Sequence, residues 1–343
     1  MHPALDSLFL ALEAPFSHIL DDGGKRICFL RAELHPAMAA VFAEHTLTCE
    51  QPFKPDYNLL ARAGLDAHAQ LEGAEKVDCV LYLATRNREE NSYNLARAIS
   101  MLKPGGKLVA AQHNKLGAGQ LEKDMKALVG NIEVFSKKHA RVLLAEKGGN
   151  INADTLNTYL AHGKPFKVQG TGLHTKAGLF SWKKVDHGSQ MLVDIIDQED
   201  LHGIGADFGA GWGFLAQRAL KMGPRIAELH LFEADKNALD MCMHNLSSTK
   251  TKLVPHWADL AHDPIEDQFD FIITNPPQHD ITNQSTALPL QLTDRAAKCL
   301  KPGGVMWLVT NRQVPVERVL EQHFSKVVDL AEDKHYKIFR VVK

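Results

Sequence analysis

Three sequence markers recur in the same order in both halves of the chain, and this repeat constrains the fold most. They are a strand pattern that begins with Asp, a Lys-Pro-Gly-Gly turn after a helical stretch, and a terminal hairpin pattern that contains His. Their corresponding residues are Asp78 and Asp270, Lys103 and Lys301, and His139 and His335, which gives offsets of 192, 198 and 196 residues. Because three markers at a near-constant offset are hard to produce by chance, we predict two copies of one α/β domain.

The two copies are not equal. We expect a degenerate domain over residues 1–150, a linker and entry segment over 151–187 and a second domain over 188–343. The first copy lacks a glycine-rich loop and ends its strand in Ala-Thr-Arg-Asn at 84–87. It is expected to keep the fold without the site, and to serve as a scaffold or as a docking domain for a large substrate.

The second half alternates strand and helix patterns, which is typical of an α/β domain. A helix is predicted over 214–221, and strands are predicted over 204–208, 228–233, 252–257, 269–274 and 304–310, followed by a hairpin over 326–330 and 336–342.

Residues 269–278 (FDFIITNPPQ) predict a buried strand that ends in a stiff double-proline turn. In open parallel sheets, ligands bind at the carboxyl ends of strands. The turn therefore offers the Asn275 amide and rigid backbone carbonyls to a ligand. These groups suit an exocyclic amine, and they bind metal or phosphate poorly.

A glycine-rich loop follows the first strand of this half, with Gly209, Gly211 and Gly213 after Asp207. A dinucleotide fingerprint would need glycine at 214, where this chain has Phe214, so an NAD(P) oxidoreductase is disfavoured. Three acids follow strands: Asp207 suits an ammonium group, Glu233 a pair of ribose hydroxyls, and Asp259 an adenine amine. Each acid has an alternative role as a helix cap or a surface charge.

Composition excludes several classes of protein. A hydrophobic fraction of 45%, a charged fraction of 23% and a net charge of −2 are those of an ordinary soluble globular chain without a global basic field. The five scattered cysteines form no C-x-x-C pair, so we expect no disulfide framework, no metal site and a cytoplasmic location. The apolar residues 8–12 predict an amphipathic first helix instead of a signal peptide, and no membrane span is expected.

Residues 162–184 are rich in glycine and carry five lysines and no acid. They form either a solvated linker or a basic aromatic surface that touches nucleic acid through Phe180, Trp182, Lys183 and Lys184.

The glycine loop, the strand-end acids and the Asn-Pro-Pro turn together resemble a Class I S-adenosylmethionine-dependent methyltransferase. The Asn-Pro-Pro-x-His motif, residues 178–181 (GLFS), residues 188–190 (GSQ) and the degenerate first copy are similar to the RsmC-type ribosomal RNA guanine-N2 methyltransferases. This resemblance implies two tandem Rossmann-like domains with mostly parallel seven-stranded sheets. It also implies a monomer that methylates the N2 amine of a guanine in 16S rRNA within the 30S subunit.

The resemblance assigns roles residue by residue. The catalytic residues would be Asn275, Pro276, Pro277 and Gln278. The residues that bind S-adenosylmethionine would be Asp207, Gly209, Gly211, Gly213, Glu233, Asp259, Asn275, Gly188 and Ser189. His279 joins Phe180, Trp182, Lys183 and Lys184 as a candidate substrate contact. The expected chemistry is that Asn275 Oδ1 and the Pro276 carbonyl accept hydrogen bonds from the target amine.

One departure from the family's sequence pattern leaves other interpretations of the function open. The family usually has Phe or Tyr where this chain has Gln278, and an aromatic ring there would stack on the flipped base. Either Phe180, Trp182 or Trp212 substitutes, or hydrogen bonds read the base edge, or activity is weak. The same turn also serves adenine-N6 and glutamine-N5 methyltransferases, and a cofactor-binding pseudoenzyme that acts as an RNA-binding module is a further alternative.

Overall fold

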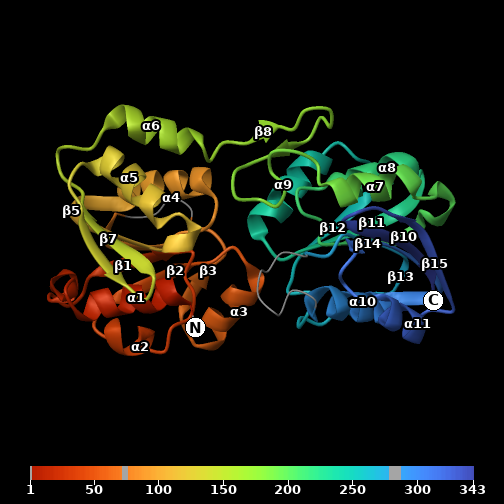
Figure 1. Ribbon diagram of the computed structural model, residues 1–343, viewed down its shortest axis with the longest axis horizontal. Helices are drawn as coiled ribbons and strands as arrows, with labels where there is room; N and C mark the ends of the chain where they lie inside the picture. Colours follow the sequence, from red (N-terminus) through yellow and green to blue (C-terminus); the bar gives the residue numbers. More distant parts are fainter. Residues whose placement is uncertain (1, 72–75, 278–286) are drawn as a thin grey trace. The chain divides into compact units, whose positions relative to one another are not determined.

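The computed structural model describes residues 2–71, 76–277 and 287–343, and the chain forms two compact units (Figure 1). The first unit comprises Met1–Phe166 and Lys176–Gly178, and the second comprises Lys167–Thr175 and Leu179–Lys343. The segment 151–187 is therefore shared between the units. Among the described residues, no helix is both long and apolar enough to cross a membrane.

The second unit is built on a seven-stranded sheet whose strands are mostly parallel. Its strand order is β12-β11-β10-β13-β14-β16-β15, and β16 is antiparallel to both of its neighbours. The strands are β10 (His202–Phe208), β11 (Arg225–Glu233), β12 (Lys252–Trp257), β13 (Phe269–Thr274), β14 (Leu300–Asn311), β15 (Lys326–Glu332) and β16 (Tyr336–Val342). All seven predicted strands are confirmed, three of them at the predicted residues.

The first unit repeats this sheet. Its order, β3-β2-β1-β4-β5-β7-β6, places the strands in the same succession, and β7 is again antiparallel to both neighbours. The strands are β1 (Arg26–Leu30), β2 (Thr46–Glu50), β3 (Asp66–His68), β4 (Val77–Leu83), β5 (Leu102–His113), β6 (Glu133–Lys137) and β7 (Ala140–Glu146). The prediction of two mostly parallel, seven-stranded α/β domains in tandem is confirmed.

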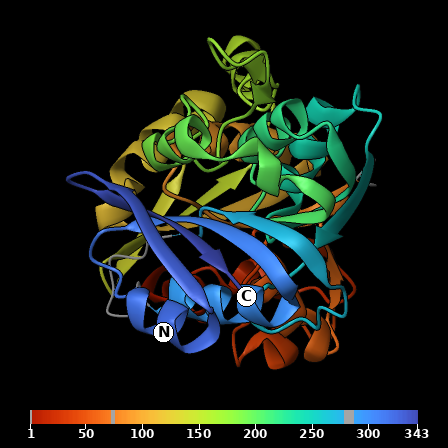
Figure 2. The same cartoon turned by 90° about the vertical axis from the view of Figure 1, so that its right-hand side faces the viewer.

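Helices cover both faces of each sheet because successive strand residues point to opposite sides. In the second unit, α7 (His187–Ile195), α8 (Phe214–Met222) and α9 (Lys236–Leu246) pack on one face, and α10 (Ala287–Cys299) and α11 (Glu317–His323) on the other (Figure 2). Along β13, Phe271 and Ile273 join the first core and Ile272 joins the second. Phe269 also joins the second core, because the strand is irregular between Phe269 and Phe271.

The first unit has the same layers. The helices on one face are α1 (Pro3–Glu13), α2 (Met38–Val41) and α3 (Lys54–Arg62), and those on the other are α4 (Arg88–Met101), α5 (Ala118–Val129) and α6 (Ala153–Ala161). Helix α1 is the predicted amphipathic first helix. The remaining elements are the 3-10 turns η1 (Ser17–Leu20), η2 (Asn114–Leu116) and η3 (Gln198–Asp200), and a two-stranded sheet of β8 (Phe166–Lys167) and β9 (His174–Thr175).

The Lys-Pro-Gly-Gly sequences differ from their prediction as turns between a helix and a strand. Both lie inside long strands, β5 and β14, as a bulge. Opposite β13, the pairing jumps from Phe269↔Leu300 to Phe271↔Val305. Gly303 adopts a left-handed φ of 80°, which a side chain disfavours, so the bulge itself requires glycine.

Candidate active site

The candidate site lies where strands β10 and β13 end side by side in the middle of the second sheet. Phe208 pairs with Thr274 at these ends, and the Thr274 hydroxyl donates a 2.7 Å hydrogen bond to the Phe208 carbonyl. This register places the glycine loop after β10 beside Asn275 after β13. The chain order reverses between these neighbouring strands, and open α/β sheets bind ligands at such a point.

The glycine loop has backbone angles that side chains rarely adopt. Gly209, Gly211 and Gly213 have φ of 86°, 55° and 92°. A Cβ at Gly211 would meet nothing within 4 Å, whereas one at Gly213 would lie 2.9 Å from Cys242 Sγ. The first part of the loop is therefore open to a ligand, and Gly213 allows helix α8 to pack closely against α9.

Two acids lie next to this loop, Asp207, which is buried, and Glu233, which is partly buried. Asp207 is 0% exposed, and neither of its carboxylate oxygens has a hydrogen-bond partner among the described residues. Burial, and then the nearby Glu233 carboxylate, raise the pKa of Asp207 to about 8, which the approach of the Ala216 backbone N–H only partly offsets. A buried, unsatisfied carboxyl group beside a ligand-accessible loop is a candidate for pairing with a cationic ligand group.

Glu233, at the end of β11, contacts the loop directly. Its Oε2 accepts a 2.7 Å hydrogen bond from the Gly211 N–H, and its Oε1 accepts a 2.9 Å hydrogen bond from the Asp235 N–H. Burial raises its pKa to about 7, against the opposing effect of these backbone donors. The structure therefore brings Asp207, Glu233 and the glycine loop together.

Asp259 follows β12 and is mostly buried. Its Oδ1 accepts a hydrogen bond from the Ala261 N–H at 3.0 Å, and its Oδ2 lies 2.8 Å from Nδ1 of His262. Both contacts are with residues of the turn that Asp259 begins, which agrees with its alternative role as a local cap.

The Asn275 side chain is held by two residues of the α7 region. Its Nδ2 donates hydrogen bonds to Asp186 Oδ2 and to Ser189 Oγ, both at 2.8 Å. The Tyr336 hydroxyl donates to Asp186 Oδ1 at 3.2 Å, and burial followed by the Asp186 charge raises the pKa of Tyr336 to about 12. Because both N–H bonds of the amide are donated, Oδ1 is the atom with which Asn275 can accept a hydrogen bond from a ligand.

A pocket joins the first part of the glycine loop, the start of α7 and Asn275, whereas Asp207, Glu233, Gly213 and Asp259 are not among its lining residues. It is lined by Phe180, Ser181, Asp186, Ser189, Gly209, Ala210, Gly211, Trp212, Phe214, Leu215 and Asn275. Gly188 is not a lining residue, but a Cβ there would lie 2.8 Å from the Tyr336 ring, so it lets α7 approach the sheet.

The aromatic and basic candidates are only partly in this pocket. The Phe180 side chain is 50% exposed, and the Phe180 carbonyl accepts a 3.0 Å hydrogen bond from the Trp212 indole. Trp182 packs against the unit's core, with Lys183 Nζ 4.7 Å from its ring centroid. Lys184 is exposed, Pro276 is buried and Pro277 is exposed, while Gln278 and His279 lie outside the described residues.

Sequence reasoning missed Asp186 and Tyr336. Asp186 could have been found, because it is the N-cap of α7 and accepts a 2.9 Å hydrogen bond from the Ser189 N–H, and Asp before an apolar helical pattern is a typical start signal. Tyr336 reaches the site from β16 and carries no local signal.

The equivalent end of the first sheet is filled by its own side chains. Arg31, with a left-handed φ of 55°, follows β1 and forms an ion pair with Glu90. Thr85 Oγ1 donates to Glu90 Oε2 at 2.7 Å, and Asn91 Oδ1 accepts from the Thr85 N–H at 2.9 Å. An ion pair and polar side chains thus stand where the second unit has its glycine loop and Asn275.

Comparison with known proteins gives consistent matches. The model of the methyltransferase small-domain family matches residues 170–340. A curated relative, ribosomal RNA small subunit methyltransferase C of Shewanella pealeana, is 29% identical over 288 residues, which cover 82% of this chain and 83% of the relative. The protein of the same name from Haemophilus influenzae strain 86-028NP is 24% identical over 281 residues, covering 82% and 84%.

A solved structure matches nearly the whole chain. It is the T. thermophilus 16S rRNA N2 G1207 methyltransferase RsmC in complex with AdoMet and guanosine, with a TM-score of 0.82 and 25% identity over 99% of this chain and 92% of that one. The likeness therefore includes both units, and not only the half that carries the pocket.

Proposed function

We propose that this chain, an S-adenosylmethionine-dependent methyltransferase of the RsmC type, methylates the exocyclic N2 amine of a guanine in 16S rRNA. The observation that carries the proposal is the fixed Asn275 amide beside an open glycine loop. The similar T. thermophilus enzyme, which acts on G1207 N2 of 16S rRNA, was solved with AdoMet and guanosine.

The pocket and the two acids next to its glycine loop fit the cofactor. The unsatisfied carboxyl of Asp207 suits a cationic amino-acid moiety, Glu233 suits ribose hydroxyls, and Gly209 and Gly211 let the backbone approach closely. Gly213, Gly188, Ser189 and Asp259 complete the proposed cofactor-binding set, of which Gly213 and Gly188 act by permitting helix packing. When bound, the cofactor supplies an electrophilic methyl group.

The acceptor amine is positioned by Asn275 Oδ1 and by the Pro276 carbonyl, which each accept an N–H hydrogen bond. The amine lone pair is normally delocalised into the purine ring. Two fixed acceptors favour a tetrahedral amine whose lone pair points at the methyl group, so positioning supplies most of the rate enhancement. The ring of Pro277 stiffens the turn by fixing φ. The released proton can pass to water or to His279.

Asp186 fixes which end of the Asn275 amide faces the amine. A carboxylate can only accept hydrogen bonds, so Asp186 selects the Nδ2 end of the Asn275 amide as its neighbour. The Oδ1 end is then the one proposed to face the target amine. Ser189 Oγ can accept the second N–H bond and supports the same orientation.

The target base must be unpaired or flipped to reach this turn. Phe180 is the half-exposed aromatic residue of the pocket and is proposed to stack on the base in place of the usual aromatic at Gln278. Trp182, Lys183 and Lys184 would contact the flanking RNA, with the lysines close to phosphate.

The remaining parts of the proposal concern context. We assign the first unit to docking on RNA, consistent with a pocket region filled by the Arg31–Glu90 pair. The substrate would be the assembled 30S subunit, acted on by a monomer in the cytoplasm. All five cysteines are buried and free, as suits a reducing compartment.

The test offers 30S subunits, naked 16S rRNA and 50S subunits in parallel, each with methyl-labelled cofactor. We expect label in the 30S arm, little in naked RNA and none in 50S. Label confined to protein, or cofactor binding without any transfer, would reject the proposal in favour of a glutamine methyltransferase or an RNA-binding pseudoenzyme.

A further inference from the structure

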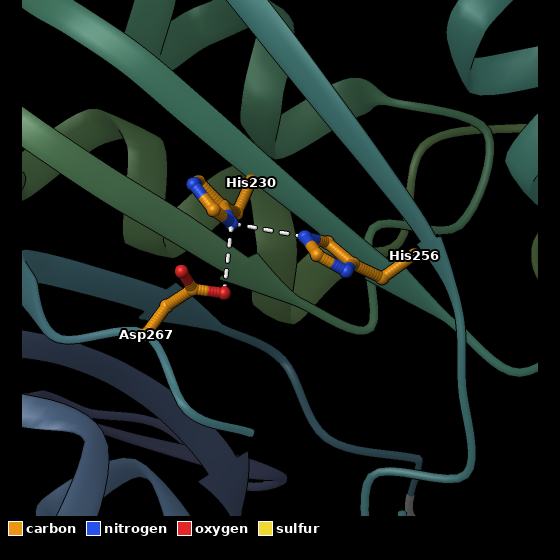
Figure 3. Close-up of side chains that lie close together, drawn as sticks. All are labelled: His230, His256 and Asp267. Atoms are coloured by element: carbon orange, nitrogen blue, oxygen red, sulfur yellow. Dashed lines mark hydrogen bonds and ion pairs between the residues drawn. The ribbon is translucent and has the colours of Figure 1, made fainter. Parts of the chain in front are cut away.

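Three potential metal ligands converge in the second unit on the sheet face that packs against α10. His230 lies in β11, His256 in β12, and Asp267 just before β13 (Figure 3). One ligand atom of each lies within 4.8 Å of the others. His230 is 5% exposed, His256 is partly buried and Asp267 is exposed, so the group opens to solvent on the Asp267 side.

The ring of His230 is oriented by a carboxylate behind it. His230 Nε2 lies 2.9 Å from Glu228 Oε1, and Lys252 donates to the other Glu228 oxygen at 2.9 Å. A carboxylate cannot donate, so it selects the tautomer with the proton on Nε2 and leaves the Nδ1 lone pair facing His256 and Asp267. A carboxylate that orients a histidine in this way is typical of metal-ligand histidines.

The spacing of the three atoms is close to that of a metal site. His230 Nδ1 lies 2.9 Å from His256 Nε2 and 3.6 Å from Asp267 Oδ2. Ligands bound at roughly 2.0–2.1 Å to one tetrahedral ion lie about 3.3 Å apart. Small side-chain shifts therefore suffice, and Figure 3 shows the His256 ring and the Asp267 carboxylate both directed at the same His230 nitrogen.

The ring of His256 is also held in place, and the three donor types favour one class of ion. His256 stacks on Phe232 with centroids 4.1 Å apart and an interplanar angle of 6°, which restrains its ring plane. Two imidazoles and one carboxylate suit borderline divalent ions such as Zn²⁺, whereas Mg²⁺ and Ca²⁺ prefer oxygen ligands alone.

We propose that His230, His256 and Asp267 bind one Zn²⁺-class divalent cation, with solvent at the remaining position. The ion replaces the hydrogen bond between the two rings and joins the segment before β13 to β11 and β12. Its function is to stabilise the edge of the sheet formed by β12 and β11, together with the segment that leads into β13. The proposal does not depend on the methyl-transfer reaction. The sequence led us to expect no metal site, because its cysteines form no C-x-x-C pair, and the three ligands proposed here lie far apart along the chain.

The test is direct binding of Zn²⁺ to the full chain after dialysis against chelator. We expect one high-affinity ion per chain by calorimetry, and a rise in Tm of about 5 °C or more at a hundredfold excess over Kd. Co²⁺ should give the visible absorption of a four-coordinate N/O site, and Mg²⁺ should produce neither effect.

Three variants locate the site. Asp267→Ala and His256→Ala should weaken Zn²⁺ binding at least about a hundredfold, and Glu228→Gln about ten- to a hundredfold, because it removes only the orienting contact. Asp267 is exposed, so its loss should leave the metal-free circular dichroism and Tm unchanged. His68→Ala is the matched control, because His68 pairs with Asp66 at 2.8 Å in an exposed His–carboxylate contact of the first unit. Equal Zn²⁺ affinity in the wild type, Asp267→Ala and His256→Ala, or no Zn²⁺ binding by the wild type, would overturn the proposal.

Discussion

The Asp186 carboxylate accepts a 2.8 Å hydrogen bond from the Asn275 side-chain amide, across 89 positions of the sequence. Asp186 begins helix α7, and Asn275 follows strand β13. This contact makes the orientation of the Asn275 amide a property of the fold and not of the Asn-Pro-Pro turn alone. The predictions on the reaction follow from it.

Asp186→Asn should reduce methyl transfer by about ten- to a hundredfold in kcat. The new amide can present a donor to Asn275 Nδ2, which favours rotation of the Asn275 side chain and turns Oδ1 away from the acceptor. Asn is also a good N-cap, so α7 should persist. Steady-state kinetics should show little change in KM for the cofactor. Asp194→Asn is the control, because Asp194 lies on the same helix and is exposed. An equal loss of kcat in this variant would contradict the orienting role of Asp186.

Asn275→Ala should abolish detectable methyl transfer, because one of the two acceptors for the amine is lost. Cofactor affinity, measured by calorimetry, should remain within a few-fold of wild type. Turnover that survives this substitution would contradict the assignment of the acceptor site.

Cofactor binding should release protons. The folded-state pKa of Asp207 is about 8, so this carboxyl is largely protonated at pH 7, whereas its ion pair with a cationic cofactor requires the ionised form. Affinity should therefore increase as pH rises from about 6 to about 8. Calorimetry at pH 7 in two buffers of different ionisation enthalpy should give different heats, and the difference should shrink in Asp207→Asn. Identical heats would argue against this role for Asp207.

The same pKa shift predicts how stability depends on pH in the cofactor-free protein. The pKa of Asp207 is raised from 3.8 to about 8 on folding, so the folded state binds more protons than the unfolded state between these values. The Asp207 contribution to the free energy of unfolding is thus present below about pH 4 and is lost as pH rises to about 8. Urea unfolding should show that Asp207→Asn is more stable relative to wild type at pH 8 than at pH 5. A constant difference would contradict the raised pKa.

Gly213→Ala should destabilise the second unit by roughly 2–4 kcal/mol, from left-handed strain and from a Cβ placed 2.9 Å from Cys242 Sγ. Gly211 also has a positive φ, but a Cβ there would meet open space. Gly211→Ala should therefore lower the free energy of unfolding by only about 1 kcal/mol. Denaturant unfolding measures both. The double variant Gly213→Ala with Cys242→Ala should recover part of the loss, and no recovery would show that the contact with Cys242 is not its source.

The fold was predictable from local patterns because both sheets are buried on two faces. Strands β12, β13 and β16 begin and end where apolar runs meet turn residues, and the duplicated Lys-Pro-Gly-Gly sequence revealed the tandem. The bulge inside β14 was not predictable, since a Pro-Gly-Gly run has the same local signature in a turn.

The site was only half predictable for a physical reason. The glycine loop and Asn275 carry local signals, because glycines mark positions with a left-handed φ and a double proline marks a stiff turn. Asp186 and Tyr336 reach Asn275 only through tertiary packing, and the three ligands at His230 meet only once the sheet has formed. The roles of Gln278 and His279 stay predictions, since both lie outside the described residues.

The most direct test of the central claim is mass-spectrometric analysis of the nucleosides of 30S-derived 16S rRNA after incubation with the chain and S-adenosylmethionine. We predict one new N2-methylguanosine per 16S rRNA with the wild type and none with Asn275→Ala. N6-methyladenosine as the product, or N2-methylguanosine formed equally by both proteins, would contradict the account.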